Sequence, residues 1–238
     1  MNRVSVVLPT YNECDNIADL IAAINRELPD PEVVVVDDDS PDGTWQIVQR
    51  LAALTPSVCL IRRVGERGLT SAIQRGINES HGYVVFWMDC DFSMPPRTMP
   101  VLLTEIERGA DVAIGSRYAN RGKDARGEWM PIALSAAINL FARLLLGGPV
   151  RDYTTGFVAA RRTVLEQIKL RGEYGEYCID FLARARRKGF RIVEVAYVCQ
   201  PREFGKSKTA SSFAGFIRRG WKYVLTILRL TIQRRTTR

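Results

Sequence analysis

The sequence predicts a three-layer α/β/α fold, in which helices cover both faces of a mainly parallel central sheet. Short runs rich in valine and isoleucine alternate with segments of helical period. These runs are apolar on both faces, which is typical of parallel strands buried between two layers of helices. The chain has 238 residues, of which 46% are hydrophobic, and this length suits one such domain with a short extension.

The expected elements follow one another in regular order along the first half of the chain. Apolar runs place strands at residues 4–8, 33–36, 58–61, 83–88 and 111–114, with a late strand at 191–199. Helical periodicity places helices at residues 16–28, 44–54, 69–80 and 98–108. The first helix illustrates the pattern, because Ile17, Ile21 and Ile24 share one face and Asp15 can cap the start.

The regular alternation ends after Tyr118. Residues 119–127 are rich in glycine and charge, which predicts a mobile loop. Residues 132–146 are nearly all apolar but too short to span a bilayer. Such a run is more often a core helix than a membrane-interfacial one, and the sequence leaves both uses open.

The formal net charge of +8 is concentrated at the C-terminal end. From residue 204 onward there is no Asp or Glu, and basic residues alternate with aromatic and aliphatic ones. A basic surface alone fits nucleic acid, anionic lipid or phosphorylated substrates, but this mixture is typical of a helix in an anionic lipid interface. We therefore expect a domain at residues 1–208 and a basic amphipathic, membrane-interfacial segment at residues 209–238.

The cysteines and the N-terminal sequence bear on the compartment. Five cysteines stand far apart without a C-x-x-C pair, which favours a reducing compartment over a disulfide framework or a zinc site. The first residues lack the layout of a signal peptide. We expect a cytoplasmic protein that is peripheral at the cytoplasmic face of a membrane and does not cross it.

Acidic residues follow two of the expected strands. Asp37, Asp38 and Asp39 come directly after one strand, and Asp89 and Asp91 come directly after another. In an open parallel sheet, ligands bind beyond the carboxyl ends of the strands, so the two groups are expected to face one crevice. Carboxylates spaced as Asp-x-Asp are hard ligands for Mg²⁺ or Mn²⁺, which usually share their coordination with substrate phosphates. Asp89 and Asp91 are therefore candidate metal ligands.

Basic residues that could bind a diphosphate also follow expected strands. Arg117 follows the strand at 111–114, and Arg202 and Lys208 follow the late strand. Arginine suits this role because its planar guanidinium bonds two phosphate oxygens at once. Arg62 and Arg63 are interpreted as surface residues without a specific role. The sequence has neither a dinucleotide-binding nor a P-loop glycine motif.

These motifs together resemble the inverting glycosyltransferases of family 2, and within them the dolichol-phosphate (polyprenyl-phosphate) mannosyltransferases. The resemblance implies a Rossmann-like nucleotide-diphospho-sugar transferase fold of the A type, and it runs from Val4 to about Lys208. The stretches that carry it occur in the expected order: VVLPTYNE (6–13), VDDDSPDGT (36–44), GLTSA (68–72), MDCD (88–91), IGSRY (114–118), TGF (155–157) and REFGKSK (202–208).

The resemblance also implies roles for single residues. Asp89, Asp91 and Arg117 would be catalytic, and Cys90 would offer backbone contacts to the donor. Ser93 stands where the family often has a glutamine that helps hold the metal, so Asp89, Asp91 and Ser93 are the expected metal set. Arg202 and Lys208 would bind phosphates. The nucleoside would be held by Pro9, Tyr11, Glu13, Val36 and Asp38.

The expected activity is transfer of a hexose from a nucleotide-sugar to a polyprenyl or dolichyl phosphate, with inversion and with Mg²⁺ or Mn²⁺ as cofactor. GDP-mannose is favoured as donor, and UDP-glucose is the competitor. One alternative is a family 2 enzyme acting on a sugar hydroxyl, which needs a carboxylate base such as Asp152 or Asp180. A second is a non-catalytic basic module. We expect no nucleic-acid partner, and the oligomeric state stays open.

Overall fold

The computed structural model describes residues 4–127, 129–202 and 213–236. The first half contains every strand and helix expected there, with ends shifted by a few residues at most. Its elements are β1 (Val4–Thr10), α1 (Ile17–Glu27), β2 (Glu32–Asp37), α2 (Thr44–Leu54), β3 (Val58–Arg62), α3 (Leu69–Glu79), β4 (Val84–Trp87), the 3₁₀ turn η1 (Pro96–Thr98), α4 (Met99–Glu107) and β5 (Val112–Ser116).

The second half is less regular. It contains several elements that the sequence interpretation did not identify, among them β7 and α7. Its elements are β6 (Lys123–Asp124), α5 (Trp129–Leu146), β7 (Val158–Arg161), α6 (Arg162–Gln167), α7 (Glu176–Arg187), β8 (Ile192–Ala196), β9 (Val198–Cys199) and α8 (Phe213–Thr236).

The central sheet has seven strands in the order β3-β2-β1-β4-β7-β5-β8. All neighbours are parallel except β7, which lies antiparallel between β4 and β5. The expectation of a mainly parallel sheet is confirmed. Because β7 is only four residues long and contains two alanines, it has little of the β-branched character that marks the other strands.

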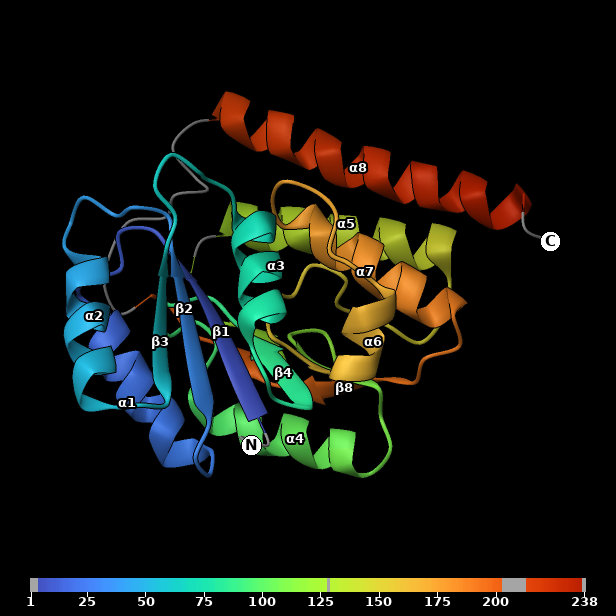
Figure 1. Ribbon diagram of the computed structural model, residues 1–238. Helices are drawn as coiled ribbons and strands as arrows, with labels where there is room; N and C mark the ends of the chain where they lie inside the picture. The colour runs from blue at the N-terminus through green and yellow to red at the C-terminus, as the bar shows by residue number, and fades with distance from the viewer. Residues whose placement is uncertain (1–3, 128, 203–212, 237–238) are drawn as a thin grey trace.

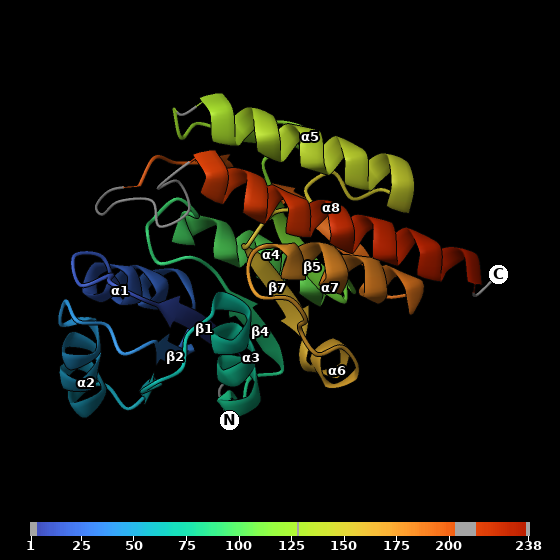
Figure 2. The same ribbon diagram turned by 90° about the horizontal axis from the view of Figure 1, so that it is seen from above.

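Helices cover both faces of the sheet, as Figures 1 and 2 show. Strand side chains alternate between two cores, as the period of two in a strand requires. On β1, Val6 and Leu8 belong to the core under α1, α2 and α4, whereas Val7 belongs to the core under α3, α5, α6, α7 and α8. The predicted three-layer α/β/α arrangement is confirmed.

A glycine lets α3 approach the sheet closely. A Cβ added to Gly76 would lie 2.3 Å from Cγ1 of Val7 and 3.0 Å from Cγ2 of Val36. Both distances are too short for carbon atoms in contact, so only glycine fits at this position. The close approach packs the C-terminal half of α3 directly against β1 and β2.

The helix α5 is longer than expected and mostly exposed. It begins at Trp129, and only Ile138, Asn139, Ala142 and Leu146 are buried. For residues 132–146 the sequence left open a core helix, which is the commoner case, and a membrane-interfacial helix. The interpretation as a core helix is wrong for most of this segment. With 18 residues, α5 is long and apolar enough to cross a membrane by length and composition, although it packs along α8 here.

The expected C-terminal amphipathic helix is present as α8, which lies beside α5 and α7 in both views. Ile227 and Leu230 are buried against the domain. Asp180 in α7 accepts a hydrogen bond from Nη2 of Arg229 at 2.9 Å. The proposed boundary at residues 208 and 209 falls outside the described residues.

The loop expected at residues 119–127 is partly a strand. Within it, β6 pairs in parallel with β9 in a separate two-stranded sheet. Arg126 adds a hydrogen bond from Nε to Asp124 at 2.8 Å. This loop therefore has a defined course beside the carboxyl edge of the sheet.

Candidate active site

The carboxyl ends of β1, β2 and β4 meet at one edge of the sheet, as predicted from the sequence. Thr10 at the end of β1 pairs with Asp37 at the end of β2. On the other side of β1, Val7 pairs with Trp87, the last residue of β4. Because these strands are neighbours, the loops that carry the two acidic groups leave the sheet at the same edge. We call Asp37, Asp38 and Asp39 the first acidic cluster, and Asp89 and Asp91 the second acidic cluster.

The first acidic cluster is held by groups of the protein itself. Asp37 is fully buried and accepts hydrogen bonds from the Thr10 hydroxyl at 2.8 Å and from the Ser40 hydroxyl at 2.6 Å. Asp38 pairs with Arg63 and also accepts from the backbone N–H of Gly68 at 2.9 Å. These carboxylates are therefore neutralised or hydrogen-bonded without any ligand.

Arg63 corrects the sequence interpretation, because it is not a surface residue without a role. Its side chain is 4% exposed, and Nε donates to Asp38 at 2.7 Å while Nη1 donates to Ser71 at 2.9 Å. Arg62 does lie at the surface, where Nε donates to Asp39 at 2.7 Å and the guanidinium stacks over Trp45. The pair Arg63–Asp38 ties the end of β2 to the end of β3, and its bonds to Gly68 and Ser71 join both to the start of α3.

The residues expected to hold the nucleoside lie around this edge but differ in exposure. Pro9, Tyr11 and Glu13 are half-buried, and the guanidinium of Arg67 lies 4.4 Å from the ring centroid of Tyr11. Val36 is fully buried under α3, and within the sheet it pairs with Pro9 of β1 and Ile61 of β3. Their role in nucleoside binding stays a prediction.

The negative charge of the second acidic cluster is much less well compensated by neighbouring groups of the protein. Asp91 is 3% exposed, accepts a hydrogen bond from the backbone N–H of Ser93 at 3.1 Å and forms an ion pair with Nε of Arg202 at 2.9 Å. Burial raises the pKa of Asp89 to about 6, and the charge of Asp91 adds to the rise, while Arg202 opposes it. Two carboxylates that resist ionising together are a natural place for a cation.

The donor set of the second acidic cluster fits Mg²⁺ or Mn²⁺. Both ligands are carboxylates, which are hard oxygen donors. Among the described residues, no group of three or more His, Cys, Asp or Glu side chains could hold a metal. Two protein carboxylates suit a cation that completes its shell with water and substrate phosphate. Ser93 is buried next to them, and its role as a ligand stays a prediction.

Two further predicted residues lie beside the second acidic cluster. Cys90 is buried, and its thiol points at the carbonyl oxygen of Pro9, with 3.6 Å from Sγ to that oxygen. The side chain is thus turned toward β1, and the backbone contacts of Cys90 to the donor stay a prediction. Arg202 reaches Asp91 directly. Lys208 lies outside the described residues.

Arg117 is engaged in an internal network. Nε and Nη2 each donate to Asp152 at 2.8 Å, and Nη2 also donates to Thr154 at 2.7 Å. Burial works against the charge, but the carboxylate of Asp152 outweighs it and raises the pKa of Arg117 well above its usual value. Asn139 of α5 joins the network by donating to Thr154 at 2.8 Å. A phosphate would have to share Arg117 with these partners.

The two carboxylates considered as general bases are also committed to ion pairs. Asp152 is fully buried and holds Arg117 in a two-point pair. Asp180 is 1% exposed and pairs with Arg184 and Arg229. Each carboxylate is therefore held by an arginine side chain and is not free to accept a proton from an acceptor hydroxyl. Sequence reasoning did not identify Asn139 or Glu176, because a lone polar residue in a helix carries no pattern.

Comparison with solved structures identifies the fold. A glucosyl-3-phosphoglycerate synthase from Mycobacterium tuberculosis, in complex with Mn²⁺, uridine diphosphate and glucosyl-3-phosphoglycerate, matches with a TM-score of 0.70 at 21% identity. The match covers 97% of this chain and 80% of that one. The same synthase with Mg²⁺ and uridine diphosphate gives a TM-score of 0.71 at 20% identity, over 97% of this chain and 79% of that one. The fold is thus that of A-type glycosyltransferases, as predicted.

Sequence comparison identifies the family. The profile of glycosyl transferase family 2 matches residues 5–169. The polyprenol monophosphomannose synthase of Mycolicibacterium smegmatis is 38% identical over 217 residues, which are 88% of this chain and 82% of that protein. The undecaprenyl-phosphate mannosyltransferase of Micrococcus luteus is 36% identical over 220 residues, which are 90% of each. This chain belongs to glycosyl transferase family 2.

A third relative is longer than this chain. The dolichol-phosphate mannosyltransferase of Pyrococcus furiosus is 37% identical over 210 residues, which are 87% of this chain but only 59% of that protein. The resemblance seen in the sequence motifs is confirmed by these relatives. The chain is a glycosyltransferase, which sets aside the alternative of a non-catalytic binding module.

Proposed function

We propose that this enzyme transfers a hexose from a nucleotide-sugar to a polyprenyl or dolichyl phosphate, with inversion at the anomeric carbon. Mannose from GDP-mannose is favoured, because the three relatives are named for mannose or phosphomannose transfer to such lipids. The observation that carries the proposal is the second acidic cluster, in which Asp89 has a pKa of about 6 beside Asp91. A diphosphate with a bound cation would stabilise both carboxylates in their ionised form.

Mg²⁺ or Mn²⁺ would be held by Asp89 and Asp91, with Ser93 beside them, and would neutralise charge on the leaving diphosphate. Structural neighbours with Mn²⁺ or Mg²⁺ bound support this choice of cation. Arg202 lies against Asp91 and is placed to contact the same phosphates. The nucleoside at the other end of the donor would be held by Pro9, Tyr11, Glu13, Val36 and Asp38.

The absence of a free base among the candidates favours a phosphate acceptor. A lipid monophosphate is largely ionised at neutral pH and attacks without losing a proton, because its second pKa is about 6. A sugar hydroxyl would need a carboxylate to accept its proton. Asp152 and Asp180 are both held in buried ion pairs, so the alternative of a hydroxyl acceptor lacks the base proposed for it. Arg117 would then contribute charge near the acceptor phosphate.

We further propose that α5 and α8 contact the membrane that holds the lipid acceptor. Large apolar side chains are exposed on both helices, which lie next to each other. Tryptophan at such positions suits the interface between headgroups and acyl chains. The cytoplasmic face is favoured by five unpaired cysteines. The exposed residues are Trp129, Met130, Leu140 and Leu144 on α5, and Trp221, Leu225, Leu228 and Ile232 on α8.

A transfer assay tests the proposed function. Purified protein is incubated with a polyprenyl phosphate in detergent, with Mg²⁺ or Mn²⁺, and with labelled GDP-mannose or UDP-glucose in parallel. Metal-dependent movement of label from one donor into the organic phase is the expected result and names the sugar. Label that enters an oligosaccharide acceptor but never the lipid phosphate would contradict the proposal and support the hydroxyl alternative.

A further inference from the structure

A cavity of about 740 Å³ lies at the same edge of the molecule as the candidate active site. Its walls are the loop that leads into α3, the loop that leads into α7 and the side of α8. We call it the α7 cavity. Thr70 at the start of α3 donates a hydrogen bond to the carbonyl oxygen of Tyr174 at 3.1 Å, which joins the two loops. The cavity is therefore built from segments that the packing of the domain holds together.

Glu176, the first residue of α7, lines this cavity with an incompletely bonded carboxylate. It is 5% exposed, and its Oε1 accepts a hydrogen bond from the backbone N–H of Glu173 at 2.9 Å. Its Oε2 is buried and has no hydrogen-bond partner within the part of the chain that the structure describes. An unpaired carboxylate oxygen away from water is costly, and native structures usually supply it with a donor. A ligand with an O–H or N–H group would supply that donor.

One wall of the α7 cavity borders the residues expected to hold the nucleoside. Arg67 lines the cavity and stacks over Tyr11. Gly68 also lines it and donates its backbone N–H to Asp38. A nucleotide bound by Tyr11 and Asp38 would therefore lie against this wall.

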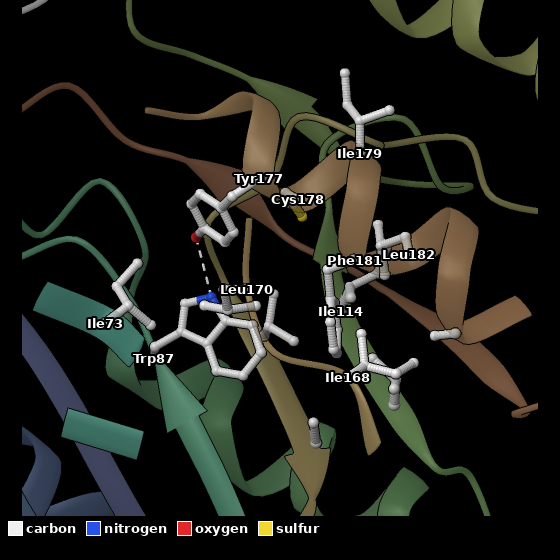
Figure 3. Close-up of a cluster of buried hydrophobic side chains, with 14 of the residues drawn as sticks. Ile73, Trp87, Ile114, Ile168, Leu170, Tyr177, Cys178, Ile179, Phe181 and Leu182 are labelled. Atoms are coloured by element: carbon white, nitrogen blue, oxygen red, sulfur yellow. Dashed lines mark hydrogen bonds between the residues drawn. The ribbon is translucent and has the colours of Figure 1, made fainter. Parts of the chain in front are cut away.

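The helix α7, which carries Glu176, also approaches the second acidic cluster. Tyr177 follows Glu176, and its hydroxyl accepts a hydrogen bond from the indole N–H of Trp87 at 3.0 Å (Figure 3). A Cβ placed on Gly156 would lie 3.8 Å from that hydroxyl and 3.8 Å from Oδ1 of Asp89. The start of α7 thus lies next to the group expected at the diphosphate.

The charges of the side chains that line the cavity indicate which kind of ligand it can hold. Glu173 and Glu176 line it and would repel a phosphate at their end, whereas the basic Arg67 lines the wall beside Tyr11. Lys222, the basic residue contributed by α8, is paired with Glu173. An uncharged group with many hydroxyls avoids the repulsion and can donate to a carboxylate oxygen. In a nucleotide-sugar, such a group is attached to the diphosphate.

We propose that the α7 cavity holds the hexose of the donor and that Oε2 of Glu176 accepts a hydrogen bond from one of its hydroxyls. The proposal rests on the proposed function, because it assumes a nucleotide-sugar donor with its diphosphate at Asp89 and Asp91. It adds a residue that distinguishes the complete donor from the nucleotide alone.

Glu176→Gln separates these two ligands. Glutamine keeps Oε1 as acceptor for the N–H of Glu173 and replaces Oε2 with an amide that cannot accept. Calorimetric titration with Mn²⁺ present compares GDP with GDP-mannose, and UDP with UDP-glucose. We expect affinity for the accepted nucleotide-sugar to fall about tenfold or more, as for loss of a hydrogen bond to a charged group. Affinity for the matching nucleoside diphosphate should be unchanged.

Glu79→Gln is the matched control, because it removes one negative charge from the exposed far end of α3. It should change neither affinity. Donors that each lack one hydroxyl extend the test. The affinity of wild type should fall by a similar factor for one of these donors. Glu176→Gln should not weaken the binding of that donor any further.

Equal losses for the nucleotide and the nucleotide-sugar, or no loss for either, would overturn the assignment of the hexose to this cavity. Glu176→Ala provides a second variant and should weaken the nucleotide-sugar at least as much, with its melting temperature recorded to exclude unfolding. If wild type binds none of the four nucleotides, the proposed function itself fails. That outcome is distinct from normal nucleotide binding without a Glu176 effect.

Discussion

The two acidic clusters look alike in the sequence but differ in the structure. Both follow buried strands and both end at the same edge of the sheet. In the first, Asp38 is bonded to Arg63 and Gly68. In the second, burial and the charge of Asp91 raise the pKa of Asp89 to about 6. The difference indicates that the first cluster organises the edge, whereas the second is left for a ligand.

The largest effect is expected from Asp91→Asn. It removes a charge from the proposed diphosphate centre, and transfer to the lipid phosphate should fall at least about a thousandfold, or about 4 kcal/mol in the barrier. The fold should be unaffected, because repulsion between Asp89 and Asp91 is relieved. A radiolabel transfer assay and a thermal melt on the same preparation measure both. Full activity in this variant would contradict the proposal that the second cluster, unlike the first, binds the ligand.

The next effect is expected from Asp38→Asn, which probes the first cluster. The change leaves Arg63 charged, with 4% of its side chain exposed, and the free energy of unfolding should fall by about 3 kcal/mol. Urea denaturation followed by circular dichroism measures it. A variant as stable as wild type would mean that the buried pair does not organise the edge and that Asp38 serves chiefly to bind ligand.

A smaller effect is expected from pH on metal binding. The pKa of Asp89 is raised, so the metal-free folded protein takes up a proton as pH falls through about 6. Ionisation of Asp89 lowers the stability of the metal-free protein as pH rises from about 4 through 6. A metal must displace that proton, so Mn²⁺ should bind about tenfold more weakly at pH 5 than at pH 7.5. Equal dissociation constants at the two pH values would contradict the raised pKa.

The smallest effect is expected from Asp39→Asn in the first cluster. Its partner Arg62 lies at the surface, with both side chains more than a third exposed, and water screens the pair. The free energy of unfolding should change by less than about 1 kcal/mol, and transfer should be unchanged. The same denaturation and transfer assays apply. A large loss of transfer would place the first cluster in the chemistry.

The sequence predicted the sheet edge and its acidic residues because strand ends can be located from apolar runs alone. Asp89 and Asp91 come where the apolar run at 83–88 stops. Because β4 pairs in parallel with β1, that point lies at the same edge of the sheet as the end of β1. The burial of single side chains and the ion pairs they form could not be predicted in this way. Arg63 has the same local pattern as Arg62, and only the approach of α3 to β2 makes one internal and the other external.

The second half of the chain was harder to predict for a physical reason. In β7, small residues and an antiparallel position remove both the β-branched signal and the strand–helix alternation. The apolar run in α5 fits a core helix as well as an interfacial one, since composition does not say which face is covered. Glu176 could not be selected from the sequence, because its proposed role depends on the cavity that it lines and on Oε2, which has no hydrogen-bond partner among the described residues.

Binding of Mn²⁺ in the presence of GDP, followed by electron paramagnetic resonance, tests most directly that the second cluster alone is the metal–diphosphate centre. The titration compares wild type with Asp91→Asn and Asp39→Asn, two variants that each remove one carboxylate charge from the same edge. The account predicts one tight site in wild type and in Asp39→Asn, and its loss in Asp91→Asn. Tight Mn²⁺ binding in Asp91→Asn, or its loss in Asp39→Asn, would contradict it.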